Sequence, residues 1–211
     1  PDVRARPGVS VDLPSVPPDT RLLGITGAPG AGKSTLAAAL DHELGLPVVP
    51  MDGFHYADVE LARRGLLDRK GAPETFDAPG YAALLRRVRA GEDDVVAPAF
   101  ERDLEQPLAG AIFVPSTGTV VTEGNYLLLD EPRWRAVRAE LDVVWHVVAD
   151  ESVRRQRLVA RHVEFGKSPD EARAWVARVD DANAALVEAA RGRADLVVDL
   201  SSGTALGAPP A

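Results

Sequence analysis

The chain has 211 residues, of which 45% are hydrophobic and 27% are charged, and this composition suits one globular domain with a substantial core. A formal net charge of -8 at pH 7 argues against a broad basic surface for nucleic acid. The absence of cysteine excludes disulfides and thiol chemistry, and every apolar stretch is far too short to span a membrane. We therefore expect a soluble cytoplasmic protein that binds neither nucleic acid nor a membrane.

The N-terminal part of the chain predicts a strand and a helix after an irregular segment. Residues 1–20 are rich in proline and predict an extended lead-in. Residues 21–26 are mostly apolar and predict a strand. Residues 33–44 carry leucines at helical spacing and predict a helix.

A phosphate-binding motif lies between this strand and this helix. The run Gly27-Ala28-Pro29-Gly30-Ala31-Gly32-Lys33-Ser34-Thr35 fits G-x-x-x-x-G-K-[ST] in full. The glycines let the backbone N–H groups face a phosphate chain, and the start of the helix adds its dipole. We expect Lys33 to reach the β- and γ-phosphates and Ser34 to bind Mg²⁺. The order of strand, motif and helix disfavours a chance match, so the motif predicts that the chain binds a nucleoside triphosphate with Mg²⁺.

A second predicted strand, over residues 47–51, leads directly into Asp52. This carboxylate would lie at the carboxyl edge of a parallel sheet, on the acceptor side of the phosphates. Phosphoryl transfer to a hydroxyl needs a group that takes up the hydroxyl proton, which suits a carboxylate. Phe54, His55 and Tyr56 would then form the wall of an acceptor pocket. The alternative is a simple turn at Asp52 with aromatic residues that cover the core, and the residues alone leave both open.

The rest of the chain alternates helices and strands. Helices are predicted over residues 57–64, 79–90, 131–140, 150–163 and 169–190. Strands of the main sheet are predicted over residues 119–122, 143–149 and 196–200, and short strands over residues 95–100 and 111–114 suggest a hairpin outside that sheet. This pattern predicts a three-layer α/β P-loop fold with a mainly parallel five-stranded sheet and helices on both faces. We expect one domain over residues 21–202, a helical lid at about residues 150–168, and a flexible tail over residues 203–211.

Two further features fit a phosphoryl-transfer site. Glu123 follows a predicted strand, where an acid would hold Mg²⁺ together with Ser34, although acids also occur there as ordinary loop residues. Arg154, Arg157 and Arg161 share one face of the helix over residues 150–163, and such arginines can close over a transferring phosphoryl group. We assign Arg157 to nucleotide binding and Arg161 to catalysis, with a solvated arginine face as the alternative.

Lysine is rare in this chain. Of 24 lysines and arginines, only Lys33, Lys70 and Lys167 are lysines, and a lysine can act as a compact point charge on phosphate. The run around Lys167 predicts a helix start, with Ser168 as the N-cap and Pro169 at the first position. His162 lacks metal-ligand spacing and is predicted to be structural or solvated. The loop residues that would grip an acceptor, or would only add surface charge, are Lys70, Phe100, Arg102 and Asn125.

Several segments resemble the group of uridine kinases, phosphoribulokinases and bacterial pantothenate kinases. They are Asp52-Gly53-Phe54, Arg64-Gly65-Leu66 and Lys70-Gly71-Ala72-Pro73-Glu74, together with the phosphate loop and residues 121–124. The block from Arg161 to Asn183 is most similar to small bacterial nucleoside or nucleotide kinase-like proteins, also called fructose-transport-associated kinases. The resemblance covers residues 21–200 and implies an ATP- and Mg²⁺-dependent kinase. It also implies that Asp52 is the base for the acceptor hydroxyl, that Glu123 serves Mg²⁺, and that the arginines belong to a mobile lid.

The resemblance defines the reaction class better than the acceptor. Phe100-Glu101-Arg102 stands where uridine kinases carry Tyr-Asp-His, and the long substrate-binding insertions of pantothenate kinases are missing. We predict transfer of the γ-phosphate of ATP to a hydroxyl of a small metabolite such as a nucleoside, a sugar or a pantothenate-like alcohol, and assembly as a homodimer stays open. The alternative is a regulatory nucleotide-binding protein without an acceptor. No N-K-x-D or T-K-x-D run supports a GTPase-type switch.

Overall fold

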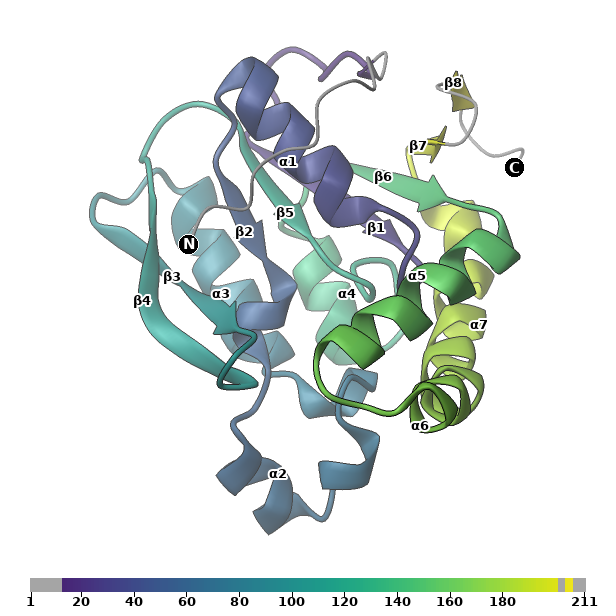
Figure 1. Cartoon of the computed structure of the whole chain (residues 1–211). Helices are drawn as coiled ribbons and strands as arrows, with labels where there is room; N and C mark the ends of the chain where they lie inside the picture. The colour runs from purple at the N-terminus through teal and green to yellow at the C-terminus, as the bar shows by residue number, and fades with distance from the viewer. Residues whose placement is uncertain (1–12, 201–203, 207–211) are drawn as a thin grey trace.

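A mainly parallel sheet forms the centre of the computed structural model, which describes residues 13–200 and 204–206 (Figure 1). Five strands run parallel in the order β2-β5-β1-β6-β7. Their bounds, in that order, are Val48–Pro50, Val120–Glu123, Leu22–Gly27, Val143–Val148 and Leu196–Asp199. A sixth strand, β8 (Thr204–Leu206), pairs antiparallel with β7. The predicted five-stranded parallel sheet is confirmed, and β8 extends it at one edge.

The two faces of the sheet are covered by different helices. Because side chains alternate along a strand, Leu22 and Val120 belong to one buried hydrophobic cluster and the next residues, Leu23 and Val121, belong to another. The helices whose residues join the first cluster are α3 (Ala78–Arg89), α4 (Pro132–Arg138) and α7 (Asp181–Ala189). The second cluster contains residues of α1 (Lys33–Leu44). The predicted three-layer arrangement is therefore confirmed (Figure 1).

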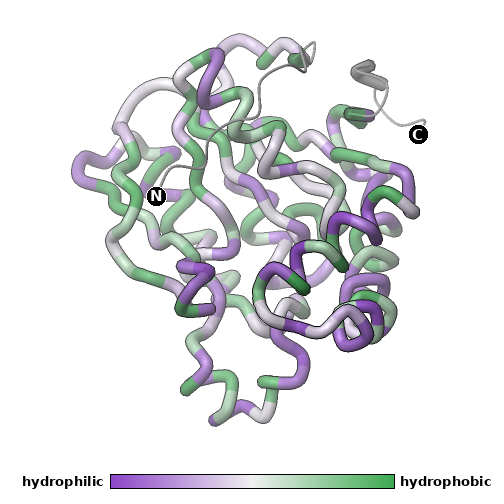
Figure 2. Tube along the Cα trace, viewed as in Figure 1, coloured by the Kyte–Doolittle hydropathy of each residue, from purple (hydrophilic) through white to green (hydrophobic). Residues whose placement is uncertain are grey.

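The predicted C-terminal helix is divided into three elements. It consists of α6 (Pro169–Trp175), a π-helical turn labelled η4 (Val176–Asp180), and α7. Its start agrees with the prediction, because Ser168 and Glu171 form a capping box and a proline stands in the first turn. In Figure 2, hydrophilic and hydrophobic segments alternate along α6, α7 and the preceding helix α5 (Glu151–Glu164). These helices pack with one face and expose the other.

The remaining elements lie outside the main sheet. An antiparallel hairpin of β3 (Val95–Glu101) and β4 (Gln106–Val114) lies outside the main sheet, as predicted, with longer strands than the sequence indicates. Five of the nine residues of β4 are exposed, among them the four consecutive residues 108–111, so buried and exposed side chains do not alternate regularly along this strand. The shorter elements are η1 (Met51–Phe54), α2 (Asp58–Arg64), η2 (Leu67–Arg69), η3 (Pro73–Thr75) and η5 (Arg191–Arg193).

The two chain ends differ in part from the expected lead-in and tail. Residues 1–12 of the lead-in lie outside the described residues, but Leu13 and Val16 pack against the hydrophobic cluster beneath α1. In the predicted flexible tail, residues 204–206 form β8, and the other tail residues lie outside the description. Over residues 13–200 and 204–206, no helix has the length and apolar character needed to cross a membrane.

Candidate active site

The phosphate loop is held tightly between β6 and α5. Gly27 has φ +147, and a Cβ atom there would lie 2.3 Å from the carbonyl oxygen of Val147. Gly30 has φ +80, and a Cβ atom there would lie 2.9 Å from the carbonyl oxygen of Arg154. Glycine is required at both positions because the backbone is left-handed and the neighbouring elements leave no space. The loop shape thus depends on the packing of distant segments as well as on its own sequence.

The buried side chains of Lys33 and Glu123 form a polar group beside this loop together with the exposed Ser34. The Nζ atom of Lys33 donates a hydrogen bond of 3.2 Å to the carbonyl oxygen of Ala28. The Ser34 hydroxyl donates one of 3.1 Å to Oε1 of Glu123. Burial lowers the pKa of Lys33 and raises the pKa of Glu123, and the opposite charge of each residue counteracts the shift in the other. This group combines a desolvated cation with two oxygen donors, which suits a phosphate chain and a hard divalent cation.

Asp52 lies near the same group because β2 and β5 are neighbours. Pro50 pairs with Glu123 in register, and the chain then turns through η1, which carries Asp52. Oδ2 of Asp52 lies 3.6 Å from Nη2 of Arg102, and both side chains are partly open to solvent. A carboxylate is therefore available at the carboxyl edge of the sheet, with a cation from the hairpin beside it.

Two adjoining pockets meet at Asp52. The first has a volume of about 280 Å³ and is lined by the phosphate loop, Glu123 and residues of α5. The second has a volume of about 340 Å³ and lies between the hairpin, η2 and the C-terminal helices. The residues that line both pockets are Pro29, Asp52, Arg102, Asn125 and Arg161. Asn125 is held at this boundary by its carbonyl oxygen, which accepts a hydrogen bond of 2.9 Å from Thr26.

The three arginines of α5 occupy different environments. Arg157 and Arg161 line the first pocket, and Nη1 of Arg157 donates to the carbonyl oxygen of Gly30 at 3.4 Å. Arg154 is only 6% exposed, and its Nη2 atom donates a hydrogen bond of 2.6 Å to Asp181 on α7. The sequence pattern places all three arginines on one face of the helix. In the structure, Arg154 is buried and links α5 to α7, whereas Arg157 and Arg161 reach the first pocket.

The three aromatic side chains after Asp52 also lie in different surroundings. His55 lines the second pocket, where its ring lies 3.9 Å from that of Phe76, and burial lowers its pKa to about 4. Phe54 and Tyr56 do not line either pocket: the ring of Phe54 packs 4.6 Å from Tyr81 in the core, and Tyr56 lies under the guanidinium of Arg64 at 4.2 Å. Of the three residues predicted to wall a pocket, the structure therefore brings only His55 to one, because Phe54, the last residue of η1, points into the core and Tyr56 packs against Arg64.

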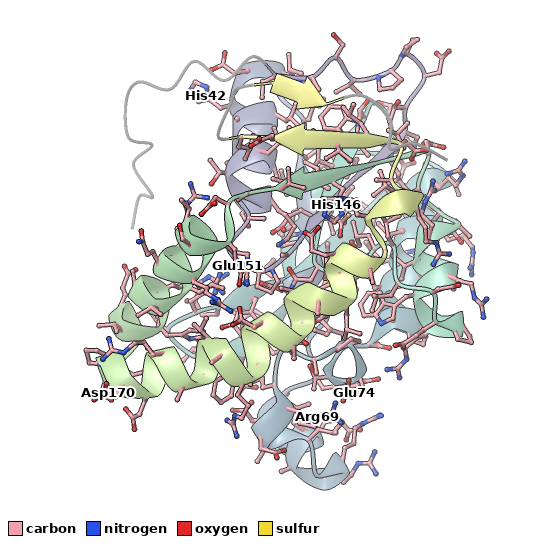
Figure 3. The ribbon with its side chains drawn as sticks, turned by 90° about the vertical axis from the view of Figure 1, so that its right-hand side faces the viewer. His42, Arg69, Glu74, His146, Glu151 and Asp170 are labelled. Carbon is pink, nitrogen blue, oxygen red and sulfur yellow. The ribbon has the colours of Figure 1, made fainter. Side chains whose placement is uncertain are left out.

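The predicted loop residues Lys70, Phe100 and Arg102 all line the second pocket. The ammonium of Lys70 forms an ion pair of 2.8 Å with Asp58 and donates to the carbonyl oxygen of Glu105 at 2.6 Å. The loop that carries Lys70 is stabilised by the Arg69–Glu74 ion pair of 2.6 Å between η2 and η3, visible in Figure 3. This wall of the second pocket is thus built from segments of the first half of the chain.

The C-terminal helices supply pocket residues that the sequence does not single out. Nε2 of His162 lies 2.8 Å from Oδ2 of Asp180, which is 7% exposed, and both residues line the second pocket. Nδ2 of Asn183 donates to the carbonyl oxygen of Gly71 at 3.3 Å. Trp175 also belongs to this wall. A histidine expected to be structural or solvated therefore faces the pocket, and the π-helical turn at Asp180 is the kind of irregularity that often marks a functional site.

Comparison with known proteins places this geometry in a family. The chain matches the family described as "Phosphoribulokinase / Uridine kinase family" over residues 22–206. It is 34% identical over 197 residues to "Uncharacterized protein YggC" of Escherichia coli, which covers 90% of this chain and 82% of that protein. It is 35% identical over 158 residues to a Schizosaccharomyces pombe protein named "Putative uridine kinase", which covers 69% of this chain and 67% of that protein.

A solved structure agrees with these relatives. A "putative fructose transport system kinase" from Silicibacter sp. TM1040 has a TM-score of 0.77 and 42% identity, over 86% of this chain and 91% of that one. The matched region contains the phosphate loop, both pockets and the C-terminal wall. This chain belongs to the phosphoribulokinase and uridine kinase family of P-loop kinases.

Proposed function

We propose that this protein transfers the γ-phosphate of ATP to a hydroxyl group of a small metabolite. Membership of the family supports an ATP-dependent kinase in general. The observation that carries the proposal further is the position of Asp52 on the boundary between two adjoining pockets. In this proposal the first pocket holds the triphosphate and the second holds the acceptor.

In the first pocket, the ammonium of Lys33 and the side-chain oxygens of Ser34 and Glu123 have separate roles. Lys33 and the N–H groups of the loop bind the phosphates. Mg²⁺ bound between Ser34, Glu123 and the phosphates would neutralise charge on the phosphate oxygens. The residues present fit this ion, since a hydroxyl and a carboxylate oxygen lie 3.1 Å apart there.

On the acceptor side, Asp52 accepts the proton of the attacking hydroxyl. The hydroxyl oxygen forms a bond to the γ-phosphorus while the bond from that phosphorus to its bridging oxygen breaks, and ADP leaves with the electron pair. Lys33 and Arg161 offset the negative charge on the transferring group. Nη2 of Arg102, 3.6 Å from Asp52, adds a positive charge beside this carboxylate.

The acceptor belongs to the class of small hydroxyl-bearing metabolites. The Schizosaccharomyces pombe relative is named for uridine and the Silicibacter structure for fructose transport, which supports a nucleoside or a sugar as a starting point. A pocket of about 340 Å³ suits a molecule of that size. The same pocket favours a kinase over a regulatory nucleotide-binding protein, which would not need a second cavity beside the phosphates.

The test is ADP release from MgATP in the presence of nucleosides, pentoses, hexoses, pantothenate and their phosphates. The Lys33→Ala and Asp52→Asn proteins serve as controls. The proposal expects one class of alcohol to raise turnover well above the rate without acceptor, in the wild type only. A panel without any stimulation, from a protein shown separately to bind ATP, would contradict an acceptor of these classes and favour the regulatory alternative.

A further inference from the structure

Every lysine of the chain lines one of the two pockets. Lys33 lines the first, and Lys70 and Lys167 line the second. The other 21 of the 24 basic residues are arginines, so arginine supplies the ordinary surface charge. Lysine presents a compact, strongly hydrated point charge that suits an anion approached from one side. Ordinary surface charge therefore does not explain why a lysine stands at position 167.

Most charges around the second pocket are already paired. Lys70 pairs with Asp58 at 2.8 Å and lies 3.9 Å from Glu105. Arg102 lies beside Asp52, and His162 lies beside Asp180 at 2.8 Å. His55 is neutral above about pH 4, because burial lowers its pKa. These contacts account for every acidic side chain that lines the second pocket.

Two cations in this pocket have no such partner. In the part of the chain that the structure describes, neither Arg161 nor Lys167 has a carboxylate oxygen within 4 Å. Arg161 also lines the first pocket, so it faces the transferring phosphoryl group. Lys167 lines the second pocket alone. Lys167 is therefore the cation of the second pocket that is available to bind the acceptor.

The surroundings of Lys167 hold it in place without neutralising it. Its ammonium lies 4.9 Å from the ring centroid of Trp175, another residue of the pocket wall. Glu171, the acid that interacts with it through space, already accepts hydrogen bonds from the N–H and the hydroxyl of Ser168 at 2.9 and 2.7 Å. The capping box thus fixes the backbone next to Lys167 and occupies this carboxylate.

We propose that the acceptor is an alcohol that carries an anionic group, a carboxylate or a phosphate, and that Lys167 binds this group. The inference rests on the proposed function, since it assumes that the second pocket holds the acceptor. The reacting hydroxyl lies at Asp52, and the anionic group lies at Lys167 with the body of the molecule against Trp175. Lys167 is a specificity-determining residue in this arrangement and takes no part in the chemical step.

The experiment compares acceptors in matched pairs that differ only in the anionic group. Suitable pairs are glycerate and glycerol, pantothenate and pantothenol, and ribose 5-phosphate and ribose. In at least one pair, the anionic member should have a kcat/KM about tenfold or more above that of the neutral member. The pair that shows the preference distinguishes a carboxylate from a phosphate. Lys167→Gln should raise the KM for the preferred acceptor about tenfold and leave the KM for ATP unchanged.

Arg178→Gln is the matched control. Arg178 lies over the same Trp175 ring, at 5.3 Å, but does not line the second pocket, so its loss should leave the acceptor KM unchanged. Neutral acceptors that work as well as their anionic partners would overturn the inference and leave the proposed kinase intact. Equal effects of Lys167→Gln and Arg178→Gln would also overturn it, because they would show a structural role for the ring contact. If no acceptor raises turnover, the proposed function fails, and this inference fails with it.

Discussion

The hydroxyl of Ser34 donates a hydrogen bond of 3.1 Å to Oε1 of Glu123, which follows it by 89 residues in the chain. The contact exists because β1 and β5 are parallel neighbours, with Ile25 paired to Glu123 in register. The Ser34 oxygen therefore comes from the start of α1, and the Glu123 oxygen comes from the end of β5. The parallel sheet brings both to its carboxyl edge, where ligands bind in folds of this kind.

Glu123→Gln should raise the Mg²⁺ concentration needed for half-maximal activity and lower turnover about tenfold or more at saturating Mg²⁺. The amide has a weaker oxygen ligand and no charge. Burial raises the pKa of Glu123, so loss of the carboxylate should not lower the thermal stability of the protein without ligands. Magnesium titrations of activity and a thermal melt test both points. Glu43→Gln, at a side chain that is 62% exposed, is the control and should behave as the wild type. An unchanged magnesium requirement in Glu123→Gln would remove this residue from the metal site.

Asp52→Asn should lower kcat by about 10²–10⁴-fold, the usual contribution of a general base, and leave ATP affinity nearly unchanged. The asparagine keeps the shape of the side chain but cannot take up the proton. Steady-state kinetics with the best acceptor, together with ATP binding by calorimetry, measure the two effects separately. Asp41→Asn, an exposed residue on α1, is the control. Turnover near the wild-type value in Asp52→Asn would show that another group takes the proton.

The sequence predicts the fold and the phosphate side because their signals are contiguous. The loop from Gly27 to Thr35 is one unbroken motif, and each parallel strand is a short apolar run. Leucines at helical spacing define α1. Such local patterns are visible without knowledge of what packs against them.

The second pocket could be predicted only in part, because its wall depends on packing between distant segments. Nothing in the order Phe54-His55-Tyr56 indicates which ring faces the pocket, since each ring packs against a residue distant in the sequence or in another element. Asp180 lines the pocket from the end of a π-helical turn, whereas the sequence predicts one continuous helix there. Asn183 reaches the carbonyl oxygen of Gly71, 112 residues earlier in the chain. These residues carry no local signal of their own.

The arginines of α5 should separate into two groups by their effects. Arg161→Ala should lower kcat while the folded protein keeps its stability, since its side chain faces the pockets. Arg154→Ala should lower the free energy of unfolding by about 2 kcal/mol, because it removes a buried, charged hydrogen bond to Asp181, which keeps only its ion pair with Arg155. Urea unfolding and kinetics on both variants test this division. A stable, poorly active Arg154→Ala protein would instead place Arg154 in catalysis.

His55 should make the stability of the protein depend on pH in the acid range. Its pKa in the folded protein is about 4, below the ordinary value of 6.5, and burial is the main cause. Between these two values the unfolded chain takes up a proton that the folded protein excludes. The free energy of unfolding should therefore fall as the pH decreases from 6.5 to about 4, by up to about 3 kcal/mol from this residue.

The variant His55→Phe should reduce this fall, because phenylalanine keeps the ring contact with Phe76 and cannot bind a proton. Urea unfolding of both proteins across the interval measures the difference, and other titrating groups cancel because they are shared. His42→Phe is the control, at a side chain that is 78% exposed, and it should retain the wild-type dependence. If His55→Phe lost stability as steeply as the wild type, the acid sensitivity would have to come from other groups, and His55 would carry its ordinary charge in the folded pocket.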